Sequence, residues 1–197
     1  MITGVLLAAG GARRFRRQKL VAPLMGVPIV RHSANAFASV ADNLIAVVGH
    51  EGPAVERALE GSGARIVQNP DWELGLATSI QRGVAAVGPE CEAIVIGVGD
   101  QPEIDPGVIR MVIARWRETG QPIVSASYRG VRGHPVLFAR PVFPELLALH
   151  GDAGARLLIE RTPERVSYVQ VDAPMPPDID TSGELEALEA RTGERDA

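Results

Sequence analysis

A cationic segment with two adjacent glycines lies near the start of the chain and could bind a polyphosphate. The small residues Ala8, Ala9, Gly10 and Gly11 let backbone N–H groups approach a phosphate closely. Five cationic side chains follow within seven residues: Arg13, Arg14, Arg16, Arg17 and Lys19. A dense group of cations after a glycine turn suits a polyphosphate. The alternative is a tight turn followed by a solvated basic surface, and the pattern matches neither the P-loop nor the dinucleotide fingerprint.

Lysine occurs once in a chain that has 20 Lys plus Arg residues. The other cations are all arginines, so Arg serves wherever a generic surface cation is enough. Lys19 either survived by chance or marks a position that needs a compact, flexible ammonium group, which Arg cannot imitate. Composition alone favours neither interpretation.

Carboxylates in two further segments could hold a divalent cation. Asp100 follows a strongly apolar run and lies in a Gly/Pro turn, and magnesium prefers one or two carboxylates together with substrate phosphates. Asp178 and Asp180 alternate before a helix start, so in an extended segment they point opposite ways. The alternatives are that Asp100 is a turn residue and that Asp180 or Thr181 only caps the helix.

Three other loops resemble site loops more than plain connectors. The segment 69–79 leads into a helix whose Thr78 or Ser79 could cap it or contact an anionic ligand. His134 follows a glycine and could contact a ligand or act as an acid or base, although a lone loop histidine is more often structural. The segment 151–156 is rich in glycine. No arrangement for covalent catalysis stands out, and Cys91 has no basic neighbours.

Alternating apolar runs and helical patterns predict an α/β domain with a largely parallel sheet at whose carboxyl edge these loops meet. Apolar runs predict strands at residues 2–8, 44–48, 93–98, 123–127 and 166–171. The residues between them predict helices at 29–39, 54–59, 78–87, 106–118 and 153–160, the last capped by Asp152, and a helix after the capping box Thr181–Glu184. The segment 128–143 breaks the rhythm and predicts further strand pairing.

Composition narrows the class of protein. The chain has 197 residues, 46% of them hydrophobic, and a net charge of −4, which predicts one globular domain over 1–197 with a polar tail from about residue 190. A weakly acidic chain is not expected to bind nucleic acid electrostatically. One cysteine excludes an internal disulfide framework. No apolar run is long enough for a membrane span, and the start reads poorly as a signal peptide, so a cytoplasmic protein is expected.

Taken together, the motifs resemble the nucleotidyltransferases of molybdenum cofactor biosynthesis, and most closely the molybdenum cofactor cytidylyltransferases. They occur in that family's order and span nearly the whole chain. The matching pieces are LLAAGGARRF…QKL at 6–20, NPDWELGLATSI at 69–80, GVGDQP at 97–102, GHPVLF at 133–138, GDAGAR at 151–156 and DIDT at 178–181. The chain departs from the family where Phe15-Arg16-Arg17-Gln18 replaces a common Met-Gly before Lys19.

The resemblance implies a three-layer α/β/α, Rossmann-like (GT-A-like) nucleotidyltransferase fold, mostly parallel with one antiparallel strand. It implies Mg2+-dependent transfer of CMP from CTP to the phosphate of the molybdopterin cofactor, with release of pyrophosphate. The roles it carries over are Leu7, Ala8, Ala9, Gly10, Gly11, Asn69, Gly75 and Ser79 for the nucleotide, Arg14 and Lys19 for the triphosphate, Asp100 and Asp180 for the metal, and His134, Asp152 and Arg156 for the acceptor.

Several alternatives stay open at this point. The guanylyl relatives tend to carry LAGG in the first loop, where this chain has Leu7-Ala8-Ala9-Gly10, so CTP is expected rather than GTP. A same-fold transferase that uses GTP or another phosphorylated acceptor is the nearest rival. A non-catalytic cofactor-binding chaperone for a molybdoenzyme is the rival from another class. A recipient molybdoenzyme or its chaperone would be the protein partner, and either Asp178 or Asp180 could face the metal.

Overall fold

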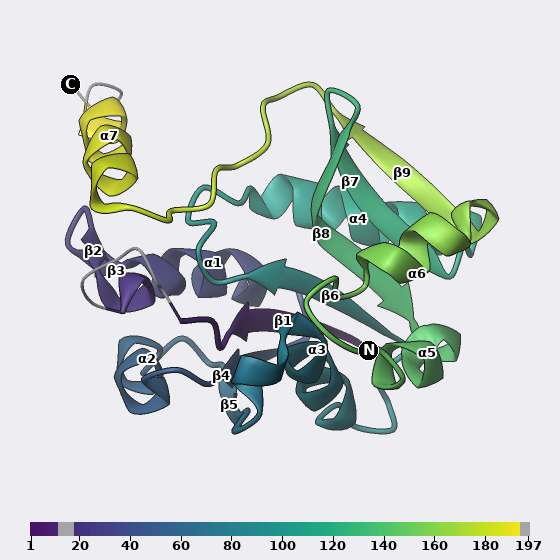
Figure 1. Cartoon of the computed structure of the whole chain (residues 1–197). Coiled ribbons are helices and arrows are strands. Elements are labelled where there is room, and N and C mark those ends of the chain that lie inside the picture. Colours follow the sequence, from purple (N-terminus) through teal and green to yellow (C-terminus); the bar gives the residue numbers. More distant parts are fainter. Residues whose placement is uncertain (12–17, 194–197) are drawn as a thin grey trace.

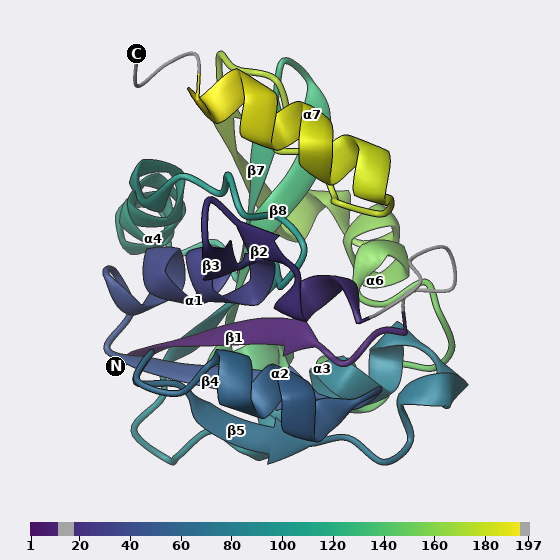
Figure 2. The same cartoon turned by 90° about the vertical axis from the view of Figure 1, so that its left-hand side faces the viewer.

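The computed structural model describes residues 1–11 and 18–193 and shows a seven-stranded sheet between two layers of helices (Figures 1 and 2). The strand order is β5-β4-β1-β6-β8-β7-β9. Only β8 runs antiparallel to its neighbours β6 and β7, while every other pairing in this sheet is parallel. The predicted fold class, with one antiparallel strand, is confirmed.

The strands lie where the apolar runs predicted them, with one addition at the edge. Those expected are β1 (Ile2–Ala8), β4 (Asn43–Val48), β6 (Ala93–Val98), β7 (Ile123–Tyr128) and β9 (Val166–Val171), and the segment after β7 forms β8 (Val131–Ala139). Edge strand β5 (Arg65–Gln68) was not predicted, because its sequence RIVQ is short and half polar. A small hairpin of β2 (Pro23–Leu24) and β3 (Val27–Pro28) was also not predicted.

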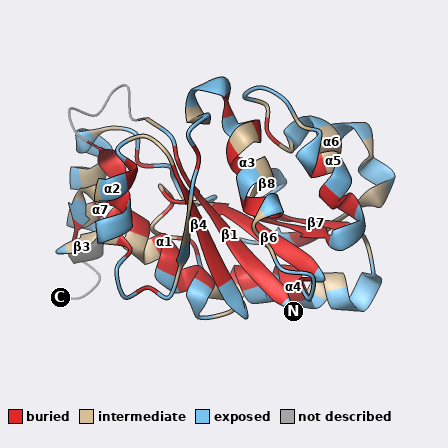
Figure 3. Ribbon diagram, turned by 90° about the horizontal axis from the view of Figure 1, so that it is seen from below, coloured by how far each residue is buried: buried red, intermediate tan, exposed pale blue. Residues whose placement is uncertain are grey.

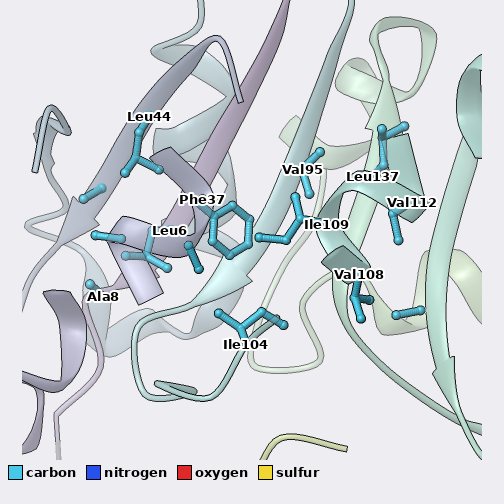
Figure 4. Close-up of a cluster of buried hydrophobic side chains, with 14 of the residues drawn as sticks. Leu6, Ala8, Phe37, Leu44, Val95, Ile104, Val108, Ile109, Val112 and Leu137 are labelled. Atoms are coloured by element: carbon cyan, nitrogen blue, oxygen red, sulfur yellow. The ribbon is translucent and has the colours of Figure 1, made fainter. Parts of the chain in front are cut away.

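Helices cover both faces of the sheet because the central strands are apolar on both sides (Figure 3). One face packs against α1 (Ile29–Ala38), α2 (Gly52–Ala58) and α4 (Pro106–Thr119). The other packs against α3 (Leu76–Ala85), α5 (Phe143–Leu147) and α6 (Arg156–Arg161). Figure 4 shows Phe37 of α1 with Leu6 and Ile109 in the hydrophobic core on the face covered by α1, α2 and α4. A side chain at Gly97 of β6 would collide with the Phe37 ring, so this glycine lets α1 approach the sheet.

The last helix, α7 (Ser182–Gly193), lies apart from both layers and beside the β2–β3 hairpin (Figure 1). Ile179 and Leu188 are buried there against Leu24 and Ile29. The predicted capping box is confirmed, because Glu184 Oε2 accepts from the Thr181 backbone N–H at 2.8 Å and Thr181 Oγ1 accepts from the Glu184 N–H at 3.2 Å. This cap holds the end of the segment that carries Asp180.

Three predicted helix starts were wrong. Helix α2 begins at Gly52, two residues before the predicted start. Helix α6 begins at Arg156 instead of residue 153, and its N-cap residue is Ala155, which makes no side-chain cap. Asp152 therefore does not cap it; a turn with positive φ at Gly151 and Gly154 precedes the helix instead. Helix α3 begins at Leu76, two residues before the predicted start, because the turn at Gly75 already sets the chain into the helix. None of the helices in the described ranges is long and apolar enough to cross a membrane.

Candidate active site

A cavity of about 790 Å³ opens at the carboxyl ends of β1 and β6, where the chain order reverses across the sheet. Ligands bind at such a reversal in open α/β sheets, because the loops after the two strands separate there. The lining brings together the glycine loop after β1, the turn before α3 and the loop after β6: Leu7, Ala8, Ala9, Gly10, Gly11, Lys19, Leu20, Trp72, Glu73, Gly75, Leu76, Ser79, Val98, Asp100 and Asp152. Many of the residues predicted for the nucleotide therefore share one cavity.

Lys19 pairs with two carboxylates at this cavity. Its Nζ lies 2.7 Å from Asp100 Oδ2 and 2.6 Å from Asp180 Oδ1. The lysine side chain is 11% exposed, against 23% for Asp100 and 50% for Asp180. Burial opposes the charge on Lys19, but the two carboxylates outweigh it and raise the pKa of the ammonium group above its ordinary value. Lys19 is therefore a firmly charged cation at the centre of the site.

Local hydrogen bonds hold each member of this trio in place. The buried Gln18 precedes a 3-10 turn at Lys19–Val21 and donates from Nε2 to the His50 carbonyl at 2.8 Å. Asp100 ends the turn after β6, and its carbonyl accepts from the Ile179 N–H at 3.0 Å. That bond ties the segment before α7 to the end of β6, which brings Asp180 to Lys19.

Asp178 faces away from Asp180, as expected for an extended segment. Its Oδ1 accepts from Gln101 Nε2 at 2.9 Å, whereas Asp180 contacts Lys19. Loss of water around the carboxyl group, and then the negative charge of Asp100, raise the pKa of Asp178. The structure thus places Asp180 beside Asp100 on Lys19 and gives Asp178 a separate partner.

The donor set at Lys19 fits a hard divalent cation that also binds substrate phosphates. Asp100 and Asp180 supply carboxylate oxygens that already gather around one positive charge. Within residues 1–11 and 18–193 no group of three or more His, Cys, Asp and Glu side chains is arranged to hold a metal by itself. Magnesium commonly takes one or two carboxylates and completes its shell with phosphates and water, so the pair is sufficient.

The turn before α3 is built from side chains that hydrogen-bond to one another. Asn69 is buried and does not line the cavity; its Nδ2 donates to Thr78 Oγ1 and to Ser79 Oγ, each at 2.9 Å. Thr78 also donates to the Gly75 carbonyl at 2.9 Å. Gly75 has φ +108°, and a Cβ there would lie 2.6 Å from the backbone of Gly151. Asn69 therefore positions Ser79, while Gly75 admits the 151–155 turn.

The residues predicted for the acceptor separate between two cavities. Asp152 lines the main cavity, whereas His134 and Arg156 line a neighbouring one of about 210 Å³ that shares Leu7 and Leu76 with it. Burial lowers the pKa of His134, and its Nδ1 is buried without a hydrogen-bond partner among the described residues. Arg156 Nε lies 3.8 Å from Glu160 Oε1. The smaller cavity is mostly apolar, so its polar side chains lie at a few points only.

Some site residues lie outside the prediction or outside the described ranges. Arg14 falls within 12–17, which the structure does not describe. Trp72 and Gln18 were not predicted as site residues, yet Trp72 lines the cavity and Gln18 anchors the turn at Lys19. An aromatic residue within a turn-rich loop is the signal that points to Trp72, whereas the sequence holds no signal for Gln18.

Comparison with known proteins identifies the family. Residues 4–166 match the model of the MobA-like NTP transferase domain. The chain is 29% identical to nicotine blue oxidoreductase of Paenarthrobacter nicotinovorans, over 95% of this chain and 96% of that protein. It is 28% identical to molybdenum cofactor cytidylyltransferase of Escherichia coli strain K12, over 70% of this chain and 69% of that protein.

A solved structure extends the likeness to three dimensions. Rv0371c of Mycobacterium tuberculosis H37Rv, in complex with manganese, is 31% identical and superposes with a TM-score of 0.78, covering 96% of this chain and 98% of that chain. The resemblance to molybdenum cofactor nucleotidyltransferases is thus confirmed at the level of the family. The chain belongs to the MobA-like NTP transferase family and is a nucleotidyltransferase.

Proposed function

We propose that the protein transfers CMP from CTP to the phosphate of the molybdopterin cofactor in a Mg2+-dependent reaction that releases pyrophosphate. The observation that carries this proposal is the pairing of Lys19 with Asp100 and Asp180 beside the glycine loop of the cavity. The choice of CTP and of this acceptor is supported by the likeness to the cytidylyltransferase of Escherichia coli.

The proposed reaction is an in-line displacement. An oxygen of the acceptor phosphate attacks the α-phosphorus of CTP, and the bond from that phosphorus to the β-phosphate oxygen breaks. The electron pair leaves with pyrophosphate, so no covalent enzyme intermediate is needed. Such a transfer depends on positioning and on neutralising charge more than on a nucleophilic side chain.

In this proposal each group of residues has one task. The backbone of Leu7–Gly11 holds the nucleotide, and Ser79, which Asn69 positions, lies at its edge. Lys19 and Arg14 neutralise the triphosphate and the charge that grows on the leaving pyrophosphate. Asp100 and Asp180 hold the cation, which when bound supplies further neutralisation at the phosphates. His134, Asp152 and Arg156 orient the acceptor.

We also propose that the protein works in the cytoplasm. Its one cysteine, Cys91, is free and buried, so the chain needs no oxidising compartment to form a disulfide. A molybdoenzyme or its chaperone would receive the product. The location and the recipient protein are both parts of the proposed function.

The test is pyrophosphate release with Mg2+ and molybdopterin cofactor, comparing CTP with GTP and ATP. We expect release with CTP and little with the purine nucleotides. Asp100→Asn serves as the inactive control, because it keeps the side-chain shape but removes a carboxylate from the proposed cation site; its fold is checked by circular dichroism. Release with GTP instead would overturn the nucleotide choice and keep the reaction type. Absence of release with all three nucleotides would overturn the proposed reaction.

A redox activity is the second candidate, because the relative named nicotine blue oxidoreductase aligns over 95% of this chain. Oxidation of NADH or NADPH, followed by absorbance in the presence of a quinonoid dye, tests it directly. The sequence lacks the dinucleotide fingerprint, so we expect no oxidation above the buffer rate. Nicotinamide oxidation that Asp100→Asn leaves intact would favour the redox activity over nucleotidyl transfer.

A further inference from the structure

The indole of Trp72 lines the main cavity between two loops that are far apart in sequence. Trp72 starts a 3-10 turn at Trp72–Leu74, which connects β5 with α3. Among the described residues that line the cavity, it is the only aromatic one. Trp72 is half-buried, so it is both packed against the protein and accessible at the cavity that it lines.

Two glycines make room for this ring. A Cβ at Gly11 would lie 3.2 Å from Cζ3 of Trp72, and a Cβ at Gly49 would lie 2.7 Å from Trp72 Cβ and 2.9 Å from Cγ. Neither glycine is among the residues with positive φ, so the backbone conformation does not demand glycine at either position. At Gly49 the Ala9 carbonyl oxygen, 2.9 Å from the added Cβ, excludes a side chain together with the indole, and at Gly11 the indole is the nearest neighbour.

A second ring packs against the indole. The ring of His50 lies 5.0 Å from that of Trp72, centroid to centroid, at an interplanar angle of 58°. The His50 backbone N–H donates to the Ala9 carbonyl at 3.0 Å, which joins the loop after β4 to the glycine loop. The ring is therefore supported on its protein side before any ligand arrives.

Next to this ring, Gly10 leaves open space. A Cβ at Gly10 would meet none of the described residues within 4 Å, and Gly10 itself is exposed. A rigid aromatic surface beside an open stretch of backbone offers a planar heterocycle both a stacking partner and N–H or carbonyl groups to bond. Because the ring is already ordered, binding to it loses little conformational entropy.

We infer that Trp72 is the aromatic surface on which the nucleobase of the substrate nucleotide stacks. This inference rests on the proposed function, since it assigns one residue of the same cavity to one part of the nucleotide. It concerns the base alone, whereas the phosphates belong with Lys19 and its two carboxylates. Stacking of this kind accepts every base, so Trp72 contributes affinity, and the choice between bases falls to other groups.

Fluorescence tests the inference directly, because the chain has 2 tryptophans. Trp116 lines a hollow with Met1 and Ile2 at the start of β1, the opposite end of that strand from the cavity, about 20 Å away at the usual rise per residue. Trp116→Phe therefore leaves Trp72 as the single reporter without touching the site. We expect CTP to quench its emission, and tripolyphosphate, which has no base, to leave the emission unchanged.

Binding is measured independently by equilibrium dialysis of radiolabelled CTP. Trp72→Ala should weaken binding about ten-fold or more, and Trp72→Phe, which keeps an aromatic ring, should stay within about three-fold of the wild type. If Trp72→Ala fails to fold, Trp72→Phe and the single-tryptophan reporter still decide the matter.

Each outcome has a separate meaning. CTP that binds in dialysis while the Trp72 emission stays constant would overturn the stacking and leave the proposed function standing. Equal quenching by tripolyphosphate would also overturn it, because the signal would then come from the phosphates. If GTP binds and quenches while CTP does neither, the stacking holds and the choice of CTP fails. If neither nucleotide binds, both proposals fall.

Discussion

Lys19 pairs with carboxylates that lie 81 and 161 positions further along the chain. A compact ammonium group can approach one oxygen of each, whereas the planar guanidinium of arginine is larger and favours bidentate pairing with one carboxylate. This geometry supports the interpretation that position 19 needs a lysine, in a chain that otherwise uses arginine. At the proposed cation site, the ammonium group and a divalent cation would therefore compete for the same two carboxylates when no nucleotide is bound.

This competition leads to a prediction for Lys19→Met. The raised pKa keeps Lys19 charged below the ordinary lysine value of 10.5, so deprotonation does not remove the competitor at neutral pH. Loss of the ammonium group should therefore tighten Mn2+ binding to the free protein. It should also lower pyrophosphate release about 100-fold or more, since a charge contact to the reacting phosphates is lost.

Electron paramagnetic resonance of free Mn2+ measures the affinity. Lys19→Arg keeps the charge and should bind Mn2+ no more tightly than the wild type, while Asp180→Asn removes a proposed ligand and should bind more weakly. Equal Mn2+ affinity in Lys19→Met and the wild type would show that the metal does not use these carboxylates.

At the scale of elements, the turn before α3 and the turn before α6 form one unit. The Ala77 N–H donates to the Gly151 carbonyl at 3.0 Å, and Gly75 touches the same backbone. The turn before α6 contributes to both cavities: Asp152 lines the main one, and Ala153 and Ala155 line the smaller one with His134 and Arg156.

Gly75→Ala should break this unit. The residue has φ +108°, and its Cβ would overlap the Gly151 backbone, so we expect a loss of about 1–3 kcal/mol in the free energy of unfolding and a higher KM for both substrates. Urea unfolding and steady-state kinetics measure the two effects. Gly88→Ala is the matched control, because its Cβ would meet none of the residues that the structure describes within 4 Å, and its stability should stay within about 0.5 kcal/mol of the wild type. Wild-type stability in Gly75→Ala would contradict the contact.

A bidentate ion pair joins α5 to the turn before β9 and should make stability depend on pH. Arg165 donates to Glu145 at 2.8 and 2.7 Å, and these hydrogen bonds lower the pKa of Glu145 below its ordinary value of 4.5. A depressed pKa stabilises the fold above pH 4.5, and the contribution is lost as the pH falls through the folded-state pKa. The side chains are 30% and 39% exposed, so solvent screens the pair to at most about 1 kcal/mol.

Glu145→Gln should therefore be less stable than the wild type at neutral pH, and the difference should vanish in acid. Urea unfolding at a series of pH values from about 7 to 3 measures it. Glu186→Gln on α7 is the exposed control and should show no such trend. A difference between Glu145→Gln and the wild type that stays constant across the series would mean that the ion pair contributes nothing.

At the scale of the whole molecule, the site depends on a segment that returns after the last strand. The family match ends at residue 166, so the stretch that carries Asp178 and Asp180 lies beyond it. Ile179, which is 1% exposed, anchors this stretch between the end of β6 and the cluster formed with Leu24, Ile29 and Leu188. The packing of an apolar side chain thus determines where one carboxylate of the candidate site lies.

Ile179→Ala should damage catalysis more than its effect on stability explains. Removing the buried side chain costs about 2–5 kcal/mol of unfolding free energy, and Leu188→Ala in the same cluster should cost a similar amount. Of these two residues, only Ile179 is next to Asp180 in the chain. We therefore expect kcat to fall about ten-fold to 100-fold in Ile179→Ala and by much less in Leu188→Ala. Both are compared at a temperature where the variants are folded. Equal loss of kcat in the two variants would mean that the anchor acts through stability alone.

Much of the fold follows from local patterns in the sequence. Continuous apolar runs predicted the central strands, because a strand covered on both faces has no polar side to interrupt the run. Edge strand β5 was not predicted, because its two exposed polar end residues leave no continuous apolar run. The start of α6 was predicted wrongly, because Asp152 resembles a helix cap in the sequence. In the structure, Gly151 and Gly154 fold the chain into a turn before the helix begins.

The candidate site divides in the same way. Small residues after β1, the single lysine and the aspartates at loop positions are visible in the amino-acid order, because their types already suggest phosphate and cation chemistry. Which aspartate joins Lys19, and how the Trp72 ring reaches Gly11 and Gly49, required the folded chain. These contacts join residues that are distant in sequence, and only the packing of β1, β4, β6 and the segment before α7 brings them together.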